Sequence, residues 1–209
     1  MAKIKIVGLG GSLAPGSSSL AALKVALQGA EGAGAETALL DLAELDLPMY
    51  RPGATSPNAA VQRLVDETAS AHGMLWSSPL YQGTISGAFK NALDWMQLLA
   101  NAEPPYLTDK PVGLISTAGG TQGLQAVNTM EYVVRALRGW AVPLVVPVPK
   151  AFEEFDAEGH AKHPDIAAAL ASLGAEVTRA AGLLAAERLT TQDAQRAEEK
   201  LQPLSNPKP

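Results

Sequence analysis

Residues 3–19 read Lys3-Ile-Lys-Ile-Val-Gly-Leu-Gly-Gly-Ser-Leu-Ala-Pro-Gly-Ser-Ser-Ser19, and this stretch decides the fold. Lys3 to Leu9 is an apolar run of strand length that ends in a glycine turn. Leucines at helical spacing follow it, at Leu20, Leu23 and Leu27. A strand that turns through glycines into a helix is the first half of a βαβ unit.

The same alternation continues along the chain and predicts a parallel sheet. The predicted strands are Lys3 to Leu9, Glu36 to Leu42, Gly73 to Ser78, Pro111 to Thr117 and Val142 to Val148. The predicted helices are Ser19 to Gly29, Pro57 to Ala71, Ile85 to Leu99, Leu124 to Leu137 and Pro164 to Ala186. We therefore expect an α/β fold of three layers, in which a five-stranded parallel sheet of order 2-1-3-4-5 has helices on both faces.

Composition indicates one globular domain. The chain has 209 residues, of which 47% are hydrophobic and 18% charged. Residues 1–187 are predicted to form this domain, and residues 188–209 a polar C-terminal tail, either a frayed helix or disordered.

Charge and cysteine content exclude several classes of function. The formal net charge is -5, and no run of Lys or Arg could neutralise a row of phosphates, so nucleic acid is not an expected partner. The absence of cysteine excludes disulfides, iron–sulfur clusters, thiolate metal sites and cysteine nucleophiles. No signal peptide and no run of roughly twenty apolar residues is present, so we expect no membrane partner and a cytoplasmic location.

The loop after the first strand has the composition of a site for a terminal phosphate. A dinucleotide fingerprint would need its third glycine where Leu13 stands, and no Lys-Ser or Lys-Thr of a P-loop follows. Hydroxyls and backbone amides at the start of a helix suit a phosphate monoester. One serine could serve only as the helix cap, but one cap does not need four. The four serines are Ser12, Ser17, Ser18 and Ser19.

The loops after the third and fourth strands are the next candidates, because these strands neighbour the first in the expected order. The third-strand loop has a turn that could face a planar heterocycle, although Pro and Gly there are also ordinary loop residues. Glycines in the fourth-strand loop let the backbone approach a ligand, or simply give flexibility. The residues are Pro79, Leu80, Tyr81, Gln82 and Gly83 in one loop, and Ser116, Thr117, Ala118, Gly119 and Gly120 in the other.

Other reactive groups form no convincing pattern. His160 and His163 lie near Asp156 and Glu158 in a polar, turn-rich stretch without clear ligand spacing, so no metal is predicted. A serine hydrolase is not supported, because no Gly-x-Ser-x-Gly motif is present. No side chain is assigned as a catalytic acid or base.

With these three loops assembled, the sequence resembles the NADPH-dependent FMN reductase family, a flavodoxin-like group that includes small quinone, azo and chromate reductases. The resemblance covers about residues 3–181. Its strongest pieces are Gly11-Ser12 with Ser17, Pro79 to Gly87 with Lys90 to Trp95, and Ala118-Gly119-Gly120. Many members have Arg at the position of Ala14 and Asn at the position of Ser19. Without that arginine, this chain has one cation fewer with which to prefer NADPH over NADH.

The resemblance implies FMN as cofactor and NAD(P)H as co-substrate. It places Ser12, Ser17 and Ser19 at the FMN phosphate, residues 79–83 at the ribityl chain and ring, and residues 116–120 at the ring edge. It implies hydride transfer from NAD(P)H through flavin N5 to a small-molecule acceptor: free flavin, a quinone, an azo compound or a metal oxyanion. A one-electron flavin carrier and a flavin-free interaction module remain the alternatives. Together with Trp95, the resemblance suggests a homodimer or homotetramer.

Overall fold

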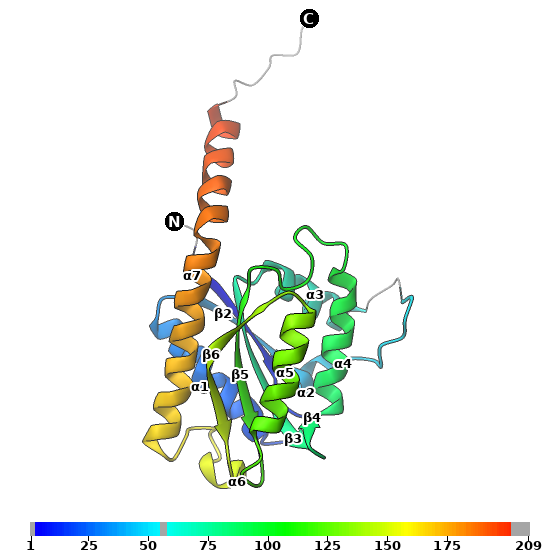
Figure 1. Cartoon of the computed structure of the whole chain (residues 1–209), viewed down its shortest axis with the longest axis vertical. Coiled ribbons are helices and arrows are strands. Elements are labelled where there is room, and N and C mark those ends of the chain that lie inside the picture. The colour runs from blue at the N-terminus through cyan, green and yellow to red at the C-terminus, as the bar shows by residue number, and fades with distance from the viewer. Residues whose placement is uncertain (1–2, 55–57, 202–209) are drawn as a thin grey trace, which may run out of the picture.

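The computed structural model describes residues 3–54 and 58–201, with the backbone alone described for residues 187–201. Strands and helices alternate along the chain (Figure 1). The strands are β1 (Lys5–Gly10), β2 (Glu36–Asp41), β3 (Gly73–Tyr81), β4 (Thr84–Ile85), β5 (Pro111–Thr117) and β6 (Trp140–Val148). The helices are α1 (Ser18–Gly32), α2 (Leu42–Leu45), α3 (Ala59–Ser70), α4 (Gly87–Trp95), η1 (Met96–Leu99), α5 (Leu124–Ala136), α6 (Ala151–Glu154) and α7 (Pro164–Leu201).

The predicted fold class is confirmed. Five strands pair in parallel in the order β2-β1-β3-β5-β6, which is the expected order once the short β4 is set aside. Helices α1 and α7 cover one face of the sheet, and α3, α4 and α5 cover the other (Figure 1). The fold is therefore the expected flavodoxin-like three-layer sandwich.

Alternating side chains in the central strands explain the two cores. On β3, Met74 and Trp76 point into the core beneath α3, α4 and α5, whereas Leu75 points into the core beneath α1 and α7. Successive residues of a strand face opposite sides of the sheet, so an uninterrupted apolar run supplies both cores.

The end of β3 was not predicted. The strand continues three residues beyond Ser78 and pairs antiparallel with β4 in a tight hairpin. Gln82 and Gly83 have φ of 49° and 81°, and positive φ at both central residues is what a type I′ turn requires. Helix α4 begins at Gly87 rather than Ile85, because Ile85 pairs with Leu80 and the Ser86 hydroxyl caps the helix.

Helices α1 and α7 touch backbone to backbone. A Cβ atom placed on Gly174 would lie 1.9 Å from the Ala26 carbonyl oxygen, and one on Gly29 would lie 2.2 Å from that of Ala171. Only glycine fits such a contact, so this pair sets the distance between the two helices.

Helix α7 is longer than predicted. It was expected to end at Ala186, and the backbone continues as helix to Leu201; the predicted helix start at Pro57 lies outside the described residues. The stretch Pro164–Ala186 is long and apolar enough to span a membrane by composition alone. Leu170, Leu173 and Val177 are nevertheless fully buried against the sheet and α1, which is the position of a core helix.

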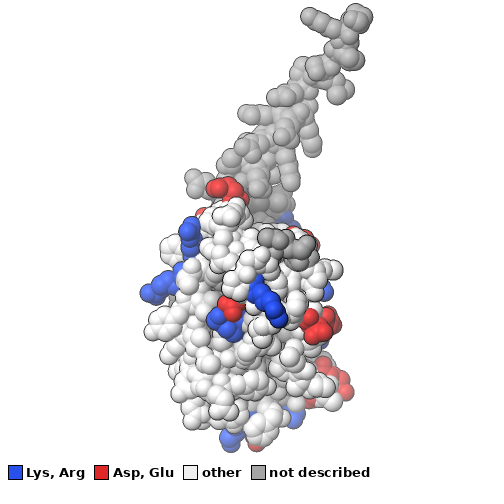
Figure 2. Space-filling model, turned by 90° about the vertical axis from the view of Figure 1, so that its right-hand side faces the viewer, with Lys and Arg blue, Asp and Glu red and all other residues white. Residues whose placement is uncertain are grey.

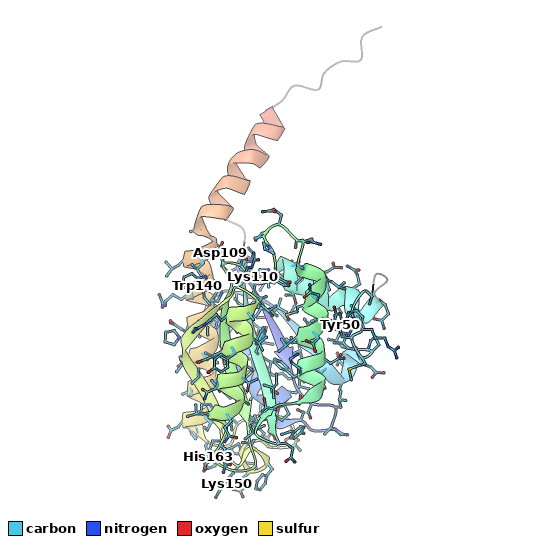
Figure 3. The ribbon with its side chains drawn as sticks, turned by 45° about the vertical axis from the view of Figure 1, so that its right-hand side comes forward. Tyr50, Asp109, Lys110, Trp140, Lys150 and His163 are labelled. Carbon is cyan, nitrogen blue, oxygen red and sulfur yellow. The ribbon has the colours of Figure 1, made fainter. Side chains whose placement is uncertain are left out.

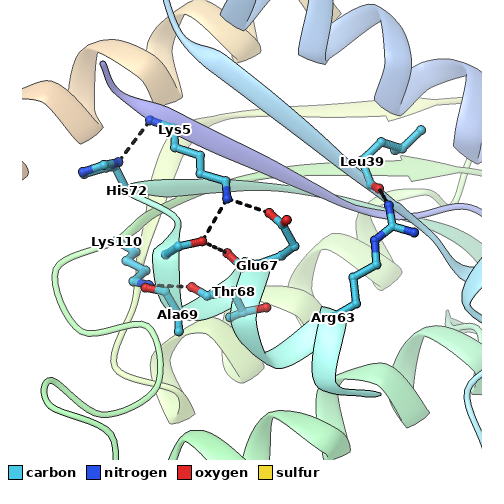
Figure 4. Close-up of polar contacts among 9 residues, drawn as sticks. Lys5, Leu39, Arg63, Glu67, Thr68, Ala69, His72 and Lys110 are labelled. Carbon is cyan, nitrogen blue, oxygen red and sulfur yellow. Dashed lines mark hydrogen bonds and ion pairs between the residues drawn. The ribbon is translucent and has the colours of Figure 1, made fainter. Parts of the chain in front are cut away.

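Polar contacts join the amino ends of β1 and β5 to the end of α3 (Figure 4). The buried Lys110 donates from Nζ to the carbonyl oxygens of Thr68 and Ala69, at 2.6 and 2.7 Å. Lys5 pairs with Glu67 at 2.8 Å, and its backbone N–H donates to Nδ1 of His72. Positive charge at a helix C-terminus is favourable, so these lysines stabilise the end of the sheet opposite the candidate site.

Candidate functional site

Four of the loops at the carboxyl edge of the sheet surround a cavity of about 230 Å³. Figure 3 shows this edge at the end of the molecule where Lys150 and His163 lie, whereas Asp109, Lys110 and Trp140 lie at the opposite end. The cavity is lined by the predicted residues Ser12, Ser17, Ser18, Ser19, Pro79, Leu80, Tyr81, Thr117, Ala118 and Gly119, together with Ala14, Pro15, Gly16, Ala151 and Phe152. The structure therefore brings residues of all three predicted loops together.

Ser12 and Ser17 are placed to donate hydrogen bonds. The Ser12 hydroxyl oxygen accepts from the Ala14 N–H at 3.3 Å, and that of Ser17 accepts from the Leu20 N–H at 3.2 Å. Each hydroxyl keeps its own proton for a ligand, since neither donates to another group in the described chain. Ser17 is thus the helix cap as well as a candidate ligand contact.

The start of α1 adds backbone donors beside these hydroxyls. The amides of Ser18 and Ser19 lie in the first turn, where a helix provides no carbonyl partner, and they have none among the described residues. The positive end of the helix dipole favours an anion at this point.

Ser19 differs from its neighbours because its side chain is buried. Its hydroxyl pairs with that of Thr117, and the Ser77 hydroxyl donates to its backbone carbonyl at 2.8 Å. These bonds connect the start of α1 to β3 and to the end of β5. Ser19 and Thr117 therefore hold the loops in position.

The hairpin places part of the second loop in the cavity. Pro79, Leu80 and Tyr81 line it, and Tyr81 is 53% exposed. Gln82 and Gly83 form the turn and do not line it. Their contact with a ligand remains a prediction.

The third loop is closed by a buried serine. The Ser116 hydroxyl donates to the Gly123 carbonyl at 2.7 Å and is fully buried, so it shapes the loop from beneath. The Ala118 N–H donates to the Val148 carbonyl, and the Ala118 carbonyl accepts from the Ala151 N–H, each at 3.0 Å. Gly119 lines the cavity with open space beside its Cα, whereas Gly120 does not line it.

Sequence reasoning missed the fourth loop, which follows β6. Ala151 and Phe152 in α6 line the cavity, and Phe152 is 68% exposed. The signal was available, because β6 ends at the same edge as the other parallel strands. The sequence-based prediction considered only the loops after the first, third and fourth predicted strands. The hydrogen bond from the Ala151 N–H to the Ala118 carbonyl joins the loop after β6 to the same site.

The chemistry of this cavity fits the FMN implied by the sequence. Its lining, taken from the described residues, has no charged side chain, so no carboxylate opposes a phosphate there. The hydroxyl and amide donors come from the first loop and the start of α1, and the other lining segments are Pro79–Tyr81 and Ala118–Gly119. Donors for a phosphate next to uncharged segments for a ring are what a flavin nucleotide requires.

No metal was predicted for the segment after β6, where Asp156, Glu158 and His160 have ligand atoms within 4.8 Å of one another. Asp156 Oδ1 accepts the backbone N–H groups of Glu158 and His160, at 3.1 and 2.8 Å. These two bonds form a turn, and the turn brings the three side chains together without a metal ion. We therefore assign no metal to this cluster.

Comparison with known proteins shows the family of the chain. Residues 4–153 match the family described as NADPH-dependent FMN reductase. The chain belongs to this family. The match covers the four loops around the cavity, up to and including Phe152.

Individual family members are moderately similar. The chain is 36% identical over 129 residues to the NADPH-dependent FMN reductase ArsH of Acidithiobacillus ferrooxidans, covering 62% of this chain and 53% of that protein. It is 30% identical to ArsH of Shigella flexneri, over 88% of this chain and 71% of the relative. The chain thus spans between about half and seven tenths of the length of these two relatives.

A solved structure confirms the fold of this FMN reductase family member. The flavoenzyme NAD(P)H:(acceptor) oxidoreductase FerB from Paracoccus denitrificans superimposes with a TM-score of 0.69 at 23% identity, over 85% of this chain and 97% of FerB. The chain therefore has both the fold and the sequence pattern of the NADPH-dependent FMN reductase family.

Contrary to the prediction, Trp95 gives no support for an oligomer. It is 4% exposed in the single chain, and its indole Nε1 donates to the Pro48 carbonyl at 2.7 Å. Its ring meets that of Tyr50 edge to face at 5.2 Å. Trp95 therefore anchors the connection after β2 to α4 within one protomer.

Proposed function

We propose that this chain holds FMN in the cavity at the carboxyl edge and uses it to pass electrons from NAD(P)H to a second small molecule. The observation that carries the proposal is the pair Ser12 and Ser17: among the described residues, their hydroxyl protons and the first amides of α1 have no partner. These groups would bind the phosphate, and the loops at Pro79–Tyr81 and Ala118–Gly119 would border the ring.

When bound, FMN would supply the redox chemistry: transfer of hydride from NAD(P)H to flavin N5, followed by reduction of free flavin, a quinone, an azo compound or a metal oxyanion. The chain's part is to bind and orient. Ser116, Ser19 and Thr117 hold the loops, and backbone N–H groups near Gly119 would stabilise the electron-rich edge of the ring. No side chain is assigned as a catalytic acid or base.

A visible spectrum separates this proposal from a flavodoxin-type carrier without its own substrate. We expect the purified, FMN-loaded chain to lose its absorbance near the flavin maximum promptly when NADPH is added without oxygen. A carrier would stay oxidised under NADPH and bleach only with a chemical reductant. A colourless chain that takes up no FMN would contradict both and leave the flavin-free module.

We also propose that the chain acts as a homodimer or homotetramer in the cytoplasm. Large apolar side chains that lie at or after the carboxyl ends of the parallel strands are exposed, and two of them, Tyr81 and Phe152, line the cavity. The others are Leu13, Met49 and Leu124. Figure 2 shows, on the face to the right in Figure 1, a broad area without Lys, Arg, Asp or Glu side chains. Exposed large apolar side chains favour association. Sedimentation showing only monomer at micromolar concentration would contradict the proposal.

A further inference from the structure

A second cavity, of about 500 Å³, adjoins the proposed FMN cavity at the first loop. Its walls come from helix α1, the end of β2 and the segment after β6. The two cavities share Ser12, Ser17 and Ser18, which provide donors for the proposed FMN phosphate. A group bound in the second cavity would therefore lie next to that phosphate.

Asp41 is the buried charged group of this second cavity. It ends β2 and pairs with Gly10 in the parallel register, which places it beside the first loop. The residue is 7% exposed, and its Oδ1 accepts the Ala43 N–H at 2.9 Å. Its other oxygen, Oδ2, has no hydrogen-bond partner among the described residues. A buried carboxylate oxygen without a partner at a cavity wall calls for a donor from a ligand.

Carboxylates outnumber ammonium groups around the second cavity. Asp41, Asp156 and Glu158 line it, against Lys24 alone among the described lining residues. The backbone N–H of His160 holds the pKa of Asp156 below its usual range, so this carboxylate is ionised at neutral pH. Bound FMN would add the negative charge of its phosphate at the shared serines. Such an excess of negative charge attracts a cation.

The arrangement of these carboxylates does not suit an inorganic cation. Mg²⁺ and Ca²⁺ need about six or more oxygen ligands at close range. Asp156 already accepts two backbone N–H groups on Oδ1, and its Oδ2 pairs with His160. Asp41 and Glu158 belong to separate elements, the end of β2 and the segment after β6. A chain that carries ammonium groups at intervals matches carboxylates on different walls.

Aromatic side chains complete the second cavity. Phe152 is exposed and Phe155 is half-buried, and both line it. The face of a phenylalanine ring attracts an ammonium group, and the ring also packs against methylene groups. A cavity of this size, with aromatic rings and dispersed carboxylates, therefore fits a flexible aliphatic amine better than a metal ion.

We propose that the second cavity binds an aliphatic polyamine, with one ammonium group donating to Asp41 Oδ2 and another lying near Glu158. Because the FMN phosphate would lie at the shared serines, the amine and FMN would each strengthen the binding of the other. This coupling rests on the proposed function, whereas the amine site itself depends only on the cavity. The polyamine concentration would then regulate how much of the chain carries FMN.

Calorimetric titration of spermidine into the FMN-free and the FMN-loaded chain, at low and constant ionic strength, tests the proposal. We expect Asp41→Asn to weaken spermidine binding about tenfold. Asparagine can keep the cap on α2, so the fold is retained. Glu158→Gln changes an exposed side chain and should weaken binding about threefold. In the wild type, FMN loading should tighten spermidine binding about fivefold.

Asp46→Asn is the matched control, because it removes the same charge close to the end of β2. Asp46 lines a different cavity with Leu13 and Met49, and asparagine tolerates its φ of 42°. Its Kd for spermidine should equal that of the wild type.

Four results would overturn the amine site: no binding of spermidine, an unchanged Kd in Asp41→Asn, an equal loss of affinity in Asp46→Asn, or displacement of spermidine by Mg²⁺ at the same concentration of charge. Equal spermidine affinity of the FMN-free and FMN-loaded chains would overturn the coupling. A chain that takes up no FMN would instead overturn the proposed function, while titration of the FMN-free chain still tests the amine site.

Discussion

Replacing Ser12 and Ser17 together with alanine is expected to weaken FMN binding by about 3 kcal/mol or more, roughly 150-fold in Kd. The reason is that each hydroxyl would donate to a doubly charged phosphate, and a hydrogen bond to a charged group contributes about 1.5–3 kcal/mol. Titration of FMN into the apoprotein, followed by quenching of flavin fluorescence, measures the effect.

A control is needed because Ser17 also caps α1. Its loss should reduce stability by about 1 kcal/mol whether or not FMN binds. Asn58→Ala removes an equivalent cap, the bond from the Val61 N–H to Asn58 Oδ1, at the exposed start of α3. This variant should lose similar stability and keep the FMN affinity of the wild type. An FMN Kd within twofold of the wild type in the double variant would refute the phosphate assignment.

Gly174→Ala is expected to destabilise the fold by about 2 kcal/mol. Helix propensity alone would favour alanine by up to about 1 kcal/mol. The new Cβ would, however, meet the Ala26 carbonyl oxygen at 1.9 Å and the Ala30 nitrogen at 2.7 Å. These are backbone atoms that no rotamer change can move, so α1 and α7 must separate and lose packing. Urea denaturation, with the same m-value in both proteins, measures the loss.

Gly182→Ala provides the comparison on the same helix. Nothing lies within 4 Å of a Cβ at Gly182, so only helix propensity acts there. This variant should be as stable as the wild type or more stable, by up to about 1 kcal/mol. If the two variants changed stability equally, the close approach of the helices would not be what requires glycine at residue 174.

Secondary structure and strand order were predicted best where a local sequence pattern is typical of a single kind of structure. The parallel strand order and the serine-rich start of α1 followed from apolar runs and from glycine and serine spacing. The β3–β4 hairpin was missed, because Gln82-Gly83 is a less typical pair for a type I′ turn than Asn-Gly. Trp95 was misread because aromatic residues at helical spacing do not reveal whether they face the core or the surface.

The sequence by itself determined that a helix would start at a hydroxyl-rich loop after the first strand, because caps and apolar periodicity act between near neighbours. Only the tertiary structure decided which of those hydroxyls are available. Ser19 is 98 residues from Thr117 in the chain, and the hydroxyls of the two are paired. The Ser12 and Ser17 hydroxyls instead accept from backbone N–H groups and donate to none of the described residues. It likewise decided that Phe152 and Asp41 border the same first loop. Such contacts join residues far apart in the chain and depend on how the strands pair, which residue spacing alone does not specify.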